Sequence, residues 1–422
     1  MRVLILAEAC NPDWASEPLI AYSAAKALAD YVDVVVVTHA RNRSAIESHG
    51  IGRAKVVYLD TDYIASPVHK ISTFLKLSAA SRTALRYPVQ LAFEYEAWKY
   101  FRDDLRENKF DIVHRLTPIS SAQPSAMSVW SPVPFVLGPI NGGLKWPSQF
   151  SQELRREKEW LRYVRGLKDL LPYAKSSYRK AAAILASFEY TIDLLPKDVR
   201  ERVIDFPENG LDTSLFHSVR TKVSRDRLSF LFVGRLVPFK CVDIALQAFA
   251  ASATLRKHSF HIIGDGPDRM RLEQLSEKLG LQECVTFHGW LPQADVSSWM
   301  READVFVFPS IRESGAGVVL EAMMSGVACV VTDYGAPGQL ISQGCGLKVA
   351  LGTRQEFVDG FINGLETMVA DSSLRDSLGK AAQEHVAAHF DWDVRARKIV
   401  EVYKWVLGKR SEKPDFYTSL NE

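Results

Sequence analysis

The sequence predicts an α/β protein with two doubly wound domains, each built on a parallel sheet. Three observations carry this prediction. The chain has 422 residues, which suits two domains because single cores rarely exceed about 250 residues. Short apolar runs alternate with helical patterns along the chain, as in parallel sheets covered by helices. A polar, turn-forming stretch near residue 210 separates two series of these runs.

Strands are expected in the first half wherever a short apolar run is bounded by polar or turn-forming residues. They are predicted at 2–7, 33–38, 55–59, 111–115, 134–138, 182–186 and 202–206. A helical pattern at 17–30 joins the first two of them.

The second half repeats this alternation. Its strands are predicted near 229–233, 259–263, 284–288, 304–308 and 327–332. A helix is expected at 242–256, after the first of these strands.

The boundary between the domains is predicted at an Asn-Gly turn signal in Pro207-Glu-Asn-Gly-Leu-Asp212. We therefore place the first domain at 1–210 and the second at 211–392. The last amphipathic stretch, about 393–410, is expected to cross back to the first domain. Ligands of open parallel sheets bind beyond the carboxyl ends of the strands, so we expect a cleft there, between the domains.

The composition is that of a globular protein. A net charge of +2 gives no support to nucleic acid as the main partner. The five cysteines are scattered, without a CxxC or Cys/His cluster, so neither a disulfide framework nor a structural zinc is expected. This usage fits a reducing cytoplasm.

A membrane-spanning segment is not expected. The apolar run at 2–7 is shorter than a signal-peptide core. No apolar stretch approaches the ~20 residues of a membrane helix. We expect a cytoplasmic protein, with contact to a membrane surface left open.

Polar loops follow several strands of the second half. In Gly234-Arg235-Leu-Val-Pro-Phe-Lys240, an Arg fork and a Lys point charge suit a diphosphate, although an ordinary basic turn is equally compatible with the pattern. The next loop contains Gly264-Asp-Gly-Pro267. A dinucleotide fingerprint would require glycine at position 269, where Arg269 stands, so a nicotinamide enzyme is disfavoured.

Two further loops complete this series. The backbone at Trp290 and Leu291 suits a nucleobase edge. Glu313 and Glu321 flank the start of an expected helix, where glycines allow close approach and free N–H groups favour an anion. Taken alone, the two acids would also fit a solvated surface.

In this order, the motifs resemble those of family 4 glycosyltransferases. They are Gly234-Arg235-Leu236 to Lys240, Ile263-Gly-Asp-Gly-Pro267, Glu313-x7-Glu321-Ala-Met and Asp333-Tyr-Gly335. The linker is similar to the Asn-Gly-Val-Asp segment of that family. The resemblance is specific over about 205–345 and topological before it. It implies a GT-B fold, with two Rossmann-like domains facing a central cleft.

The resemblance also implies a role for each matched residue. Arg235 and Lys240 would hold the donor diphosphate, Glu313 would contact the transferred sugar, and Glu321 would accept the ribose hydroxyls. The remaining donor contacts would come from Gly234, Gly264, Trp290, Leu291, Gly315, Ala316, Gly317 and Val318. Because the two cations and the helix N-terminus neutralise the diphosphate, neither a metal nor a cofactor is expected.

The chain departs from the family pattern at three places. Cys241 follows Lys240 where glycine is common, and Gly315-Ala316-Gly317 replaces a frequent Phe-Gly. The loop after the first strand reads Trp14-Ala-Ser-Glu-Pro18 instead of Gly-Gly, which makes a phosphate role for that loop doubtful.

The first domain is expected to bind the acceptor. His114 stands at a strand end, where the family often has a histidine near the transferred sugar; a structural histidine is the alternative. Asn141, Gly142 and Gly143 form a second strand-end loop, whose backbone would approach substrate. Asp60-Thr-Asp62 resembles a metal motif of another fold but is predicted to be a solvated turn.

Residues 153–180 are rich in Arg, Lys and large apolar side chains. At helical spacing they would form a basic amphipathic surface on anionic lipid. The alternative is a solvated helix with one stripe facing the core.

The sequence thus predicts a retaining, metal-independent glycosyltransferase that uses a UDP- or GDP-type sugar. The expected acceptor is a saccharide or lipid-linked saccharide, in surface polysaccharide biosynthesis. Two alternatives stay open: a GT-B nucleotide-sugar epimerase or hydrolase, and a catalytically silent partner subunit.

Overall fold

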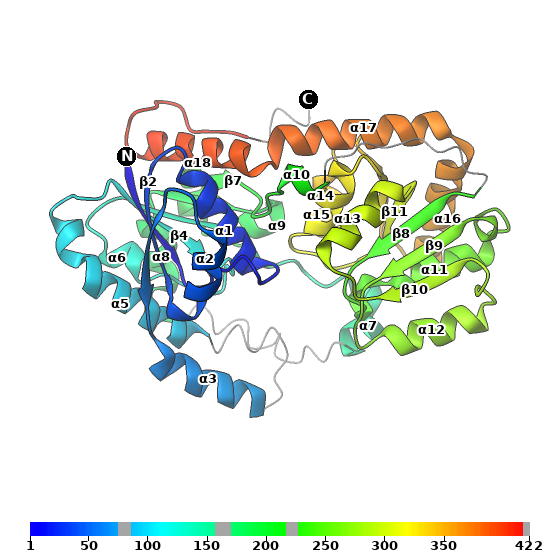
Figure 1. The fold of residues 1–422 in the computed structure, drawn as a ribbon, viewed down its shortest axis with the longest axis horizontal. Coiled ribbons are helices and arrows are strands. Elements are labelled where there is room, and N and C mark those ends of the chain that lie inside the picture. The colour runs from blue at the N-terminus through cyan, green and yellow to red at the C-terminus, as the bar shows by residue number, and fades with distance from the viewer. Residues whose placement is uncertain (75–85, 157–169, 217–226, 417–422) are drawn as a thin grey trace.

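The computed structural model describes residues 1–74, 86–156, 170–216 and 227–416. Two α/β halves lie side by side, each with one sheet and helices on both of its faces (Figure 1). Every named strand pair in both sheets is parallel. The predicted fold class, two doubly wound Rossmann-like domains, is confirmed.

The first sheet has seven strands in the order β3-β2-β1-β4-β5-β6-β7. The order reverses direction at β1, as in a doubly wound sheet. The strands are β1 (Arg2–Ala7), β2 (Asp33–His39), β3 (Lys55–Leu59), β4 (Ile112–Thr117), β5 (Phe135–Ile140), β6 (Ala183–Ala186) and β7 (Val203–Asp205). Each predicted range agrees with its strand to within about two residues.

The second sheet has six strands in the order β10-β9-β8-β11-β12-β13. They are β8 (Ser229–Val233), β9 (Ser259–Ile263), β10 (Val285–Gly289), β11 (Val305–Phe308), β12 (Ala328–Thr332) and β13 (Leu347–Val349). The sequence analysis missed β13. It has three residues at the edge of the sheet and only Val349 is buried, so it lacks the apolar run that identified the others.

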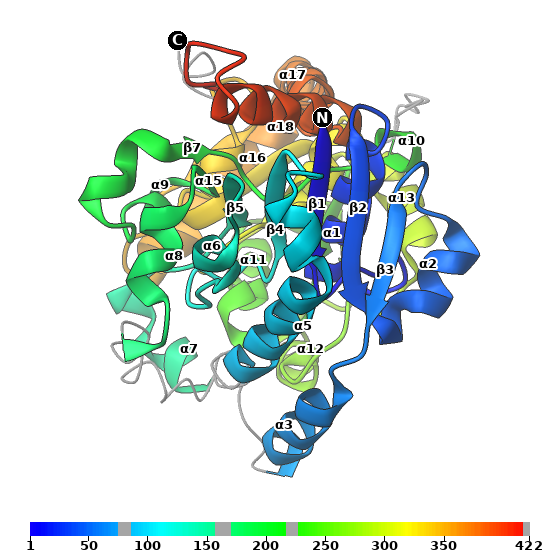
Figure 2. The same cartoon turned by 90° about the vertical axis from the view of Figure 1, so that its left-hand side faces the viewer.

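The longer helices follow the strands as expected for crossover connections. In the first half they are α1 (Glu17–Leu28), α2 (Arg43–His49), α3 (Asp62–Phe74) and α5 (Tyr87–Arg106); in the second, α11 (Val242–Ala251), α12 (Arg269–Lys278), α13 (Gln293–Glu302), α14 (Gly317–Met324), α16 (Arg354–Ala370) and α17 (Ser372–His389). Shorter helices are α6 (Met127–Trp130), α7 (Ser151–Arg156), α8 (Ala174–Lys180), α9 (Glu189–Ile192), α10 (Thr213–Phe216) and α15 (Gly335–Leu340). Figure 2 looks at the first half, with α5 in front of its sheet.

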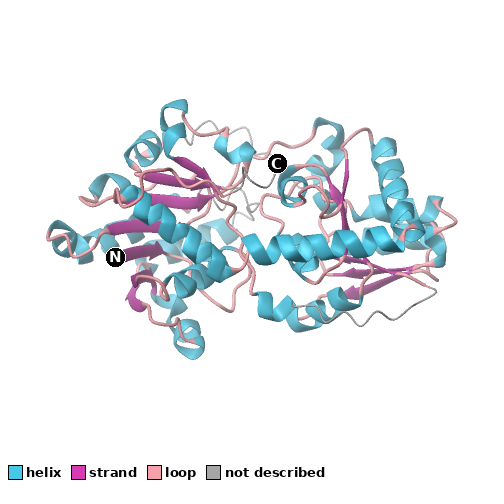
Figure 3. Cartoon of the chain, turned by 90° about the horizontal axis from the view of Figure 1, so that it is seen from above, coloured by secondary structure: helices cyan, strands magenta, loops and turns pink. Residues whose placement is uncertain are grey.

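The last two helices run along one side of both halves (Figure 1). α17 packs on α14 and β12, whereas α18 (Trp392–Val406) packs on α1. Ala396, Ile399 and Tyr403 of α18 are buried in one hydrophobic cluster with β1 and α1. The chain therefore returns to the first sheet after completing the second; seen from above, the two sheets stay in separate halves (Figure 3).

The segment around α7 crosses in the opposite direction. Phe150 lies in the hydrophobic cluster of the second sheet and meets Phe357 edge to face at 5.6 Å. In Figure 1, α7 lies beside the second half, near α12. Residues that precede the linker thus contribute to the second core, while the boundary near 210 stays a prediction.

Candidate functional site

The polar loops beyond β8 and β11 bring together an ion pair whose two side chains are only 11% and 14% exposed. The Nζ atom of Lys240 lies 2.5 Å from Oε1 of Glu313, which also accepts a hydrogen bond of 3.1 Å from the Ser310 hydroxyl. Lys240 is only 8% exposed and stands 4.7 Å from the centre of the Phe308 ring. Buried charges are costly unless paired, so each of these groups stabilises the other.

Two departures from the family pattern fall where the backbone is left-handed. Cys241 follows Lys240 with φ 49°, and Ala316 precedes α14 with φ 52°. Side chains adopt this region at a cost of about 1–2 kcal/mol, whereas glycine does not. The left-handed backbone at Cys241 and Ala316 would suit glycine better, and in this chain two small residues adopt it.

The loops beyond β8 and β9 contact each other backbone to backbone. A Cβ atom on Gly264 would lie 2.0 Å from the carbonyl oxygen of Gly234. The N–H of Gly264 donates to the carbonyl of Gly289, at 2.7 Å. The neighbouring loop thus requires glycine at position 264. Packing alone explains this glycine, so its presence is no evidence for the predicted donor contact.

The loop before α14 is held from outside its own domain. The carbonyl of Ser314 accepts hydrogen bonds from Nδ2 of Asn141 and from the Tyr190 hydroxyl, both at 2.6 Å. The carbonyl of Gly315 accepts from Nδ2 of Asn209, also at 2.6 Å. We call residues 313–317 the donor loop.

The other predicted donor residues differ in their exposure. Glu321, on α14, is half-buried, and burial raises the pKa of its carboxyl to about 7 against the opposing effect of a hydrogen bond with Gln293. Trp290 is 72% exposed and Leu291 is half-buried. Arg235 is exposed, with no ion pair to any residue that the structure describes. An exposed guanidinium remains available to an anionic ligand.

His114 does not face a cleft. It is fully buried, with Nε2 2.6 Å from the carbonyl oxygen of Gly138 and Nδ1 2.6 Å from the Tyr403 hydroxyl. Because the carbonyl only accepts, Nε2 carries the proton and Nδ1 accepts from Tyr403. Burial lowers the pKa of His114 to about 4, with a smaller effect of the Arg115 charge. This geometry supports the structural alternative, and we leave His114 out of the site.

The glycines after Asn141 are explained by packing. Gly143 has φ 86°, and a Cβ atom there would lie 1.9 Å from Cδ1 of Leu194. The N–H of Gly142 donates to the Thr191 hydroxyl, at 3.2 Å. Among residues 141–143, it is the side chain of Asn141 that contacts the donor loop.

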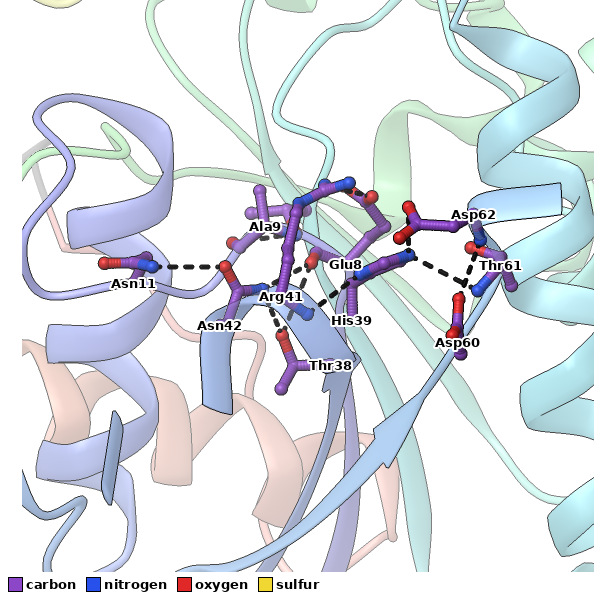
Figure 4. A network of polar contacts seen from close by, with 11 residues as sticks. Glu8, Ala9, Asn11, Thr38, His39, Arg41, Asn42, Asp60, Thr61 and Asp62 are labelled. Atoms are coloured by element: carbon purple, nitrogen blue, oxygen red, sulfur yellow. Dashed lines mark hydrogen bonds and ion pairs between the residues drawn. The ribbon is translucent and has the colours of Figure 1, made fainter. Parts of the chain in front are cut away.

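A network of polar side chains follows β1 and β2, as Figure 4 shows. Asn42 donates through Nδ2 to the carbonyl of Glu8 and to the Thr38 hydroxyl, both at 2.9 Å. Its Oδ1 accepts from Asn11, and Arg41 pairs with Glu8. The sequence analysis missed this network, because its members are spread over two loops and match no spacing rule.

At one side of this network, His39, Asp60 and Asp62 have ligand atoms within 4.8 Å of one another. The ring does not suit a metal, however. The N–H of Arg41 points to Nδ1 at 3.1 Å and the N–H of Thr61 to Nε2 at 3.3 Å. Since a metal-bound imidazole normally donates through its other nitrogen, these donors oppose a metal at either atom. The exposed Asp60 and Asp62 agree with a turn.

The described part of the region 153–180 contains the end of α7 and the whole of α8. α7 ends at Arg156 and α8 begins at Ala174; residues 157–169 lie outside the described residues. Glu153 pairs with Arg354 at 2.8 Å, and Arg156 pairs with Asp268. In the described part of the region, α7 therefore faces the second half of the protein.

Comparison with known proteins shows which proteins the chain is similar to. Residues 217–385 match the sequence profile of the family "Glycosyl transferases group 1". D-inositol 3-phosphate glycosyltransferase of Kribbella flavida is 30% identical over 193 residues, which are 43% of this chain and 44% of that protein. The chain thus spans about half the length of the curated relatives that it matches.

Solved structures agree over nearly the whole chain. Sucrose-phosphate synthase of Thermosynechococcus elongatus has a TM-score of 0.64 at 16% identity, covering 97% of this chain and all of the other. HepE of Anabaena, solved with UDP, has a TM-score of 0.64 at 19% identity, over 96% of this chain and 100% of HepE. The chain resembles the GT-B glycosyltransferases. Its fold is GT-B, with the ion pair and the donor loop inside the segment that matches the family.

The structure also bears on membrane insertion. Within the described residues, no helix combines the length and the apolar character that crossing a bilayer requires.

Proposed function

We propose that this protein is a glycosyltransferase that takes its sugar from a UDP- or GDP-type nucleotide. The observation that carries this proposal is the buried pair of Lys240 and Glu313, beside the N-terminus of α14. A lysine suits a diphosphate, a carboxylate suits sugar hydroxyls, and the free N–H groups of a helix start suit a phosphate. The match of residues 217–385 to a glycosyltransferase family supports the same assignment.

The proposed reaction retains the configuration of the transferred sugar. The bond between the anomeric carbon and the phosphate oxygen breaks, and the acceptor oxygen bonds to that carbon from the same face. The acceptor proton passes to the departing phosphate. Lys240 and Arg235 would stabilise the negative charge that grows on the leaving diphosphate, which is the charge that matters for the rate. These two cations and the helix N-terminus supply this stabilisation without a metal.

The proposed acceptor is a saccharide or a lipid-linked saccharide, in surface polysaccharide biosynthesis. This part of the proposal rests on the family resemblance. We propose that the protein lies in the cytoplasm, with peripheral contact to the inner face of the cytoplasmic membrane through the basic region 153–180. An acceptor on a lipid carrier would require such contact.

A thermal-shift series tests the donor. The protein is heated with UDP, GDP, ADP and their glucose or mannose conjugates, each with and without excess EDTA. The true donor type raises the melting temperature by mass action, by an amount that corresponds to about 2.7 kcal/mol at 100 times its Kd. We expect the shift to survive EDTA. Absence of a shift with every nucleotide would refute the proposal, and a shift abolished by EDTA would refute metal independence.

A further inference from the structure

Glu208 is a buried carboxyl group in the linker between the two halves, and none of the proposed steps uses it. It is 6% exposed and follows β7 by a few residues. Its Oε1 atom accepts a hydrogen bond of 2.7 Å from Nδ2 of Asn141. The family resemblance assigns nothing to this position.

Asn141 connects Glu208 to the donor loop. Its Nδ2 donates one hydrogen to Glu208 and the other to the carbonyl of Ser314, at 2.6 Å. Glu208 therefore holds the amide group of Asn141 with its nitrogen toward Ser314. A rotated amide would place an oxygen against the Ser314 carbonyl, where neither atom can donate. The Thr191 hydroxyl adds a weaker contact to Oδ1 of Asn141, at 3.4 Å.

Glu208 also limits where the donor loop can lie. A Cβ atom on Gly315 would stand 2.5 Å from Oε1 of Glu208 and 2.8 Å from Nδ2 of Asn209. The backbone of Gly315 thus rests directly on the carboxyl group. Asn209 fixes the next carbonyl by its hydrogen bond of 2.6 Å to Gly315.

Fixing these carbonyls fixes the amides that follow them. In a planar trans peptide the N–H points away from the C=O of the same unit. The N–H groups of Gly315 and Ala316 are consequently turned away from Asn141 and Asn209. Gly315 and Ala316 are among the predicted donor contacts, and in the proposed site their N–H groups would meet the diphosphate.

We propose that Glu208 is a positioning residue for donor binding, which acts through Asn141 and its contact with Gly315 to aim the donor-loop amides at the diphosphate. This inference rests on the proposed function. It adds a residue of the linker to the donor site and identifies the phosphate end of the ligand as the part that depends on it.

The test compares Glu208→Gln, Glu208→Ala and wild type. The ligand is whichever of UDP, GDP and ADP shifts the melting temperature of the wild type most, with its own nucleoside as the second ligand. Glutamine keeps an oxygen for Asn141, so Glu208→Gln should bind the diphosphate within about twofold of wild type. Glu208→Ala should raise the Kd of the diphosphate about tenfold and leave that of the nucleoside within about twofold.

The control is Glu94→Ala. Glu94 is fully buried and accepts from Ser125 and from the N–H of Met127, on the far side of the first half. It should lower the melting temperature without changing either Kd. Loss of stability alone is thereby separated from loss of phosphate binding.

Asn141→Ala should weaken binding of the diphosphate in the same way. It replaces Glu208→Ala in the test if that variant does not fold. Because Glu208 acts on the Ser314 carbonyl through Asn141, the double variant should bind the diphosphate no more weakly than the weaker-binding of the two single variants. Equal effects on diphosphate and nucleoside, no effect of Glu208→Ala, or additive effects of the two substitutions would overturn the inference alone. A wild type that binds no nucleoside diphosphate would overturn the proposed function with it.

Discussion

Replacing Glu321 by glutamine should stabilise the protein above neutral pH while weakening its binding of the nucleotide. Glu321 is half-buried on α14, and burial raises the pKa of its carboxyl from 4.5 to about 7. The folded protein therefore takes up a proton at this group more readily than the unfolded chain does. In the proposed ribose contact, the charge of Glu321 would be held at the expense of stability.

The sign and size follow from linkage. Below pH 4.5 the carboxyl is protonated in both states and has no effect. As the pH rises from 4.5 to about 7, the unfolded chain ionises first, and the folded state loses stability. The difference between the two pKa values corresponds to about 3 kcal/mol at about 1.4 kcal/mol per pKa unit. Glutamine removes this loss and can keep the hydrogen bond with Gln293.

The assay is thermal unfolding of wild type and Glu321→Gln at pH 5 and pH 8, without nucleotide. About 3 kcal/mol in a domain of roughly 200 residues corresponds to a rise of roughly 6–12 °C in melting temperature at pH 8, with a much smaller difference at pH 5. Glu356→Gln is the control: hydrogen bonds with Thr353 lower the pKa of that exposed carboxyl, so its removal should not stabilise at pH 8.

Binding should change in the opposite direction. A glutamine cannot replace the charge-assisted hydrogen bonds to two ribose hydroxyls, which is a loss of about 2 kcal/mol, or roughly 30-fold in Kd. In wild type, binding below pH 7 also requires deprotonation of Glu321. As the pH is lowered, the affinity of wild type for the nucleotide should therefore decrease more steeply than that of the variant. A variant that is no more stable at pH 8 would refute the burial argument, and an unchanged Kd would remove the ribose role.

Three further predictions follow from the site and the surface. Lys240→Ala should lower kcat more than donor affinity, since leaving-group charge grows in the transition state; an equal effect on both in a nucleotide-release assay would contradict this role. His114→Ala should lower the free energy of unfolding by about 3 kcal/mol, because it leaves the Tyr403 hydroxyl and the Gly138 carbonyl buried without a partner. The kcat per folded molecule at 15 °C should stay within about twofold of wild type. A large loss of kcat without loss of stability would return His114 to the site. Co-sedimentation with anionic vesicles should be salt-sensitive, and salt-independent or absent binding would end the membrane proposal.

The fold was predictable because each central strand carries its signal within a few residues. Residues Val3 to Ala7 are fully buried, and such runs mark parallel strands whatever surrounds them. β13 lacked this signal, since an edge strand of three residues buries little. Helix ends were less certain: α11 stops at Ala251, five residues before the predicted end, and the next residue, Ser252, accepts a hydrogen bond from the N–H of Leu255.

The site was predictable only where its residues are close in sequence. Glu313, Gly315 and Ala316 form one loop, and Lys240 ends another whose place at the sheet edge follows from the fold. Glu208, in the linker, and Tyr190, on α9, contact the same loop although both lie far from it in the sequence. No spacing rule relates either residue to the loop. The surroundings of His114 were not predictable for a related reason: Tyr403, which occupies its Nδ1, is contributed by α18.

The ion pair of Lys240 and Glu313 suggests how a donor diphosphate would bind where the lysine is already neutralised by a carboxylate. A buried lysine is costly without an anion, and so is a buried carboxylate without a cation. A diphosphate that approaches Lys240 supplies the anion and frees Glu313 from its role as counter-ion. Glu313 then gains hydroxyl donors from the sugar, which satisfy its oxygens. Lys240 thus exchanges one anion for another, and Glu313 exchanges a cation for neutral hydrogen-bond donors. Removing Glu313 alone should therefore weaken binding less than removing Lys240, because the diphosphate pairs with the lysine directly and not with the acid.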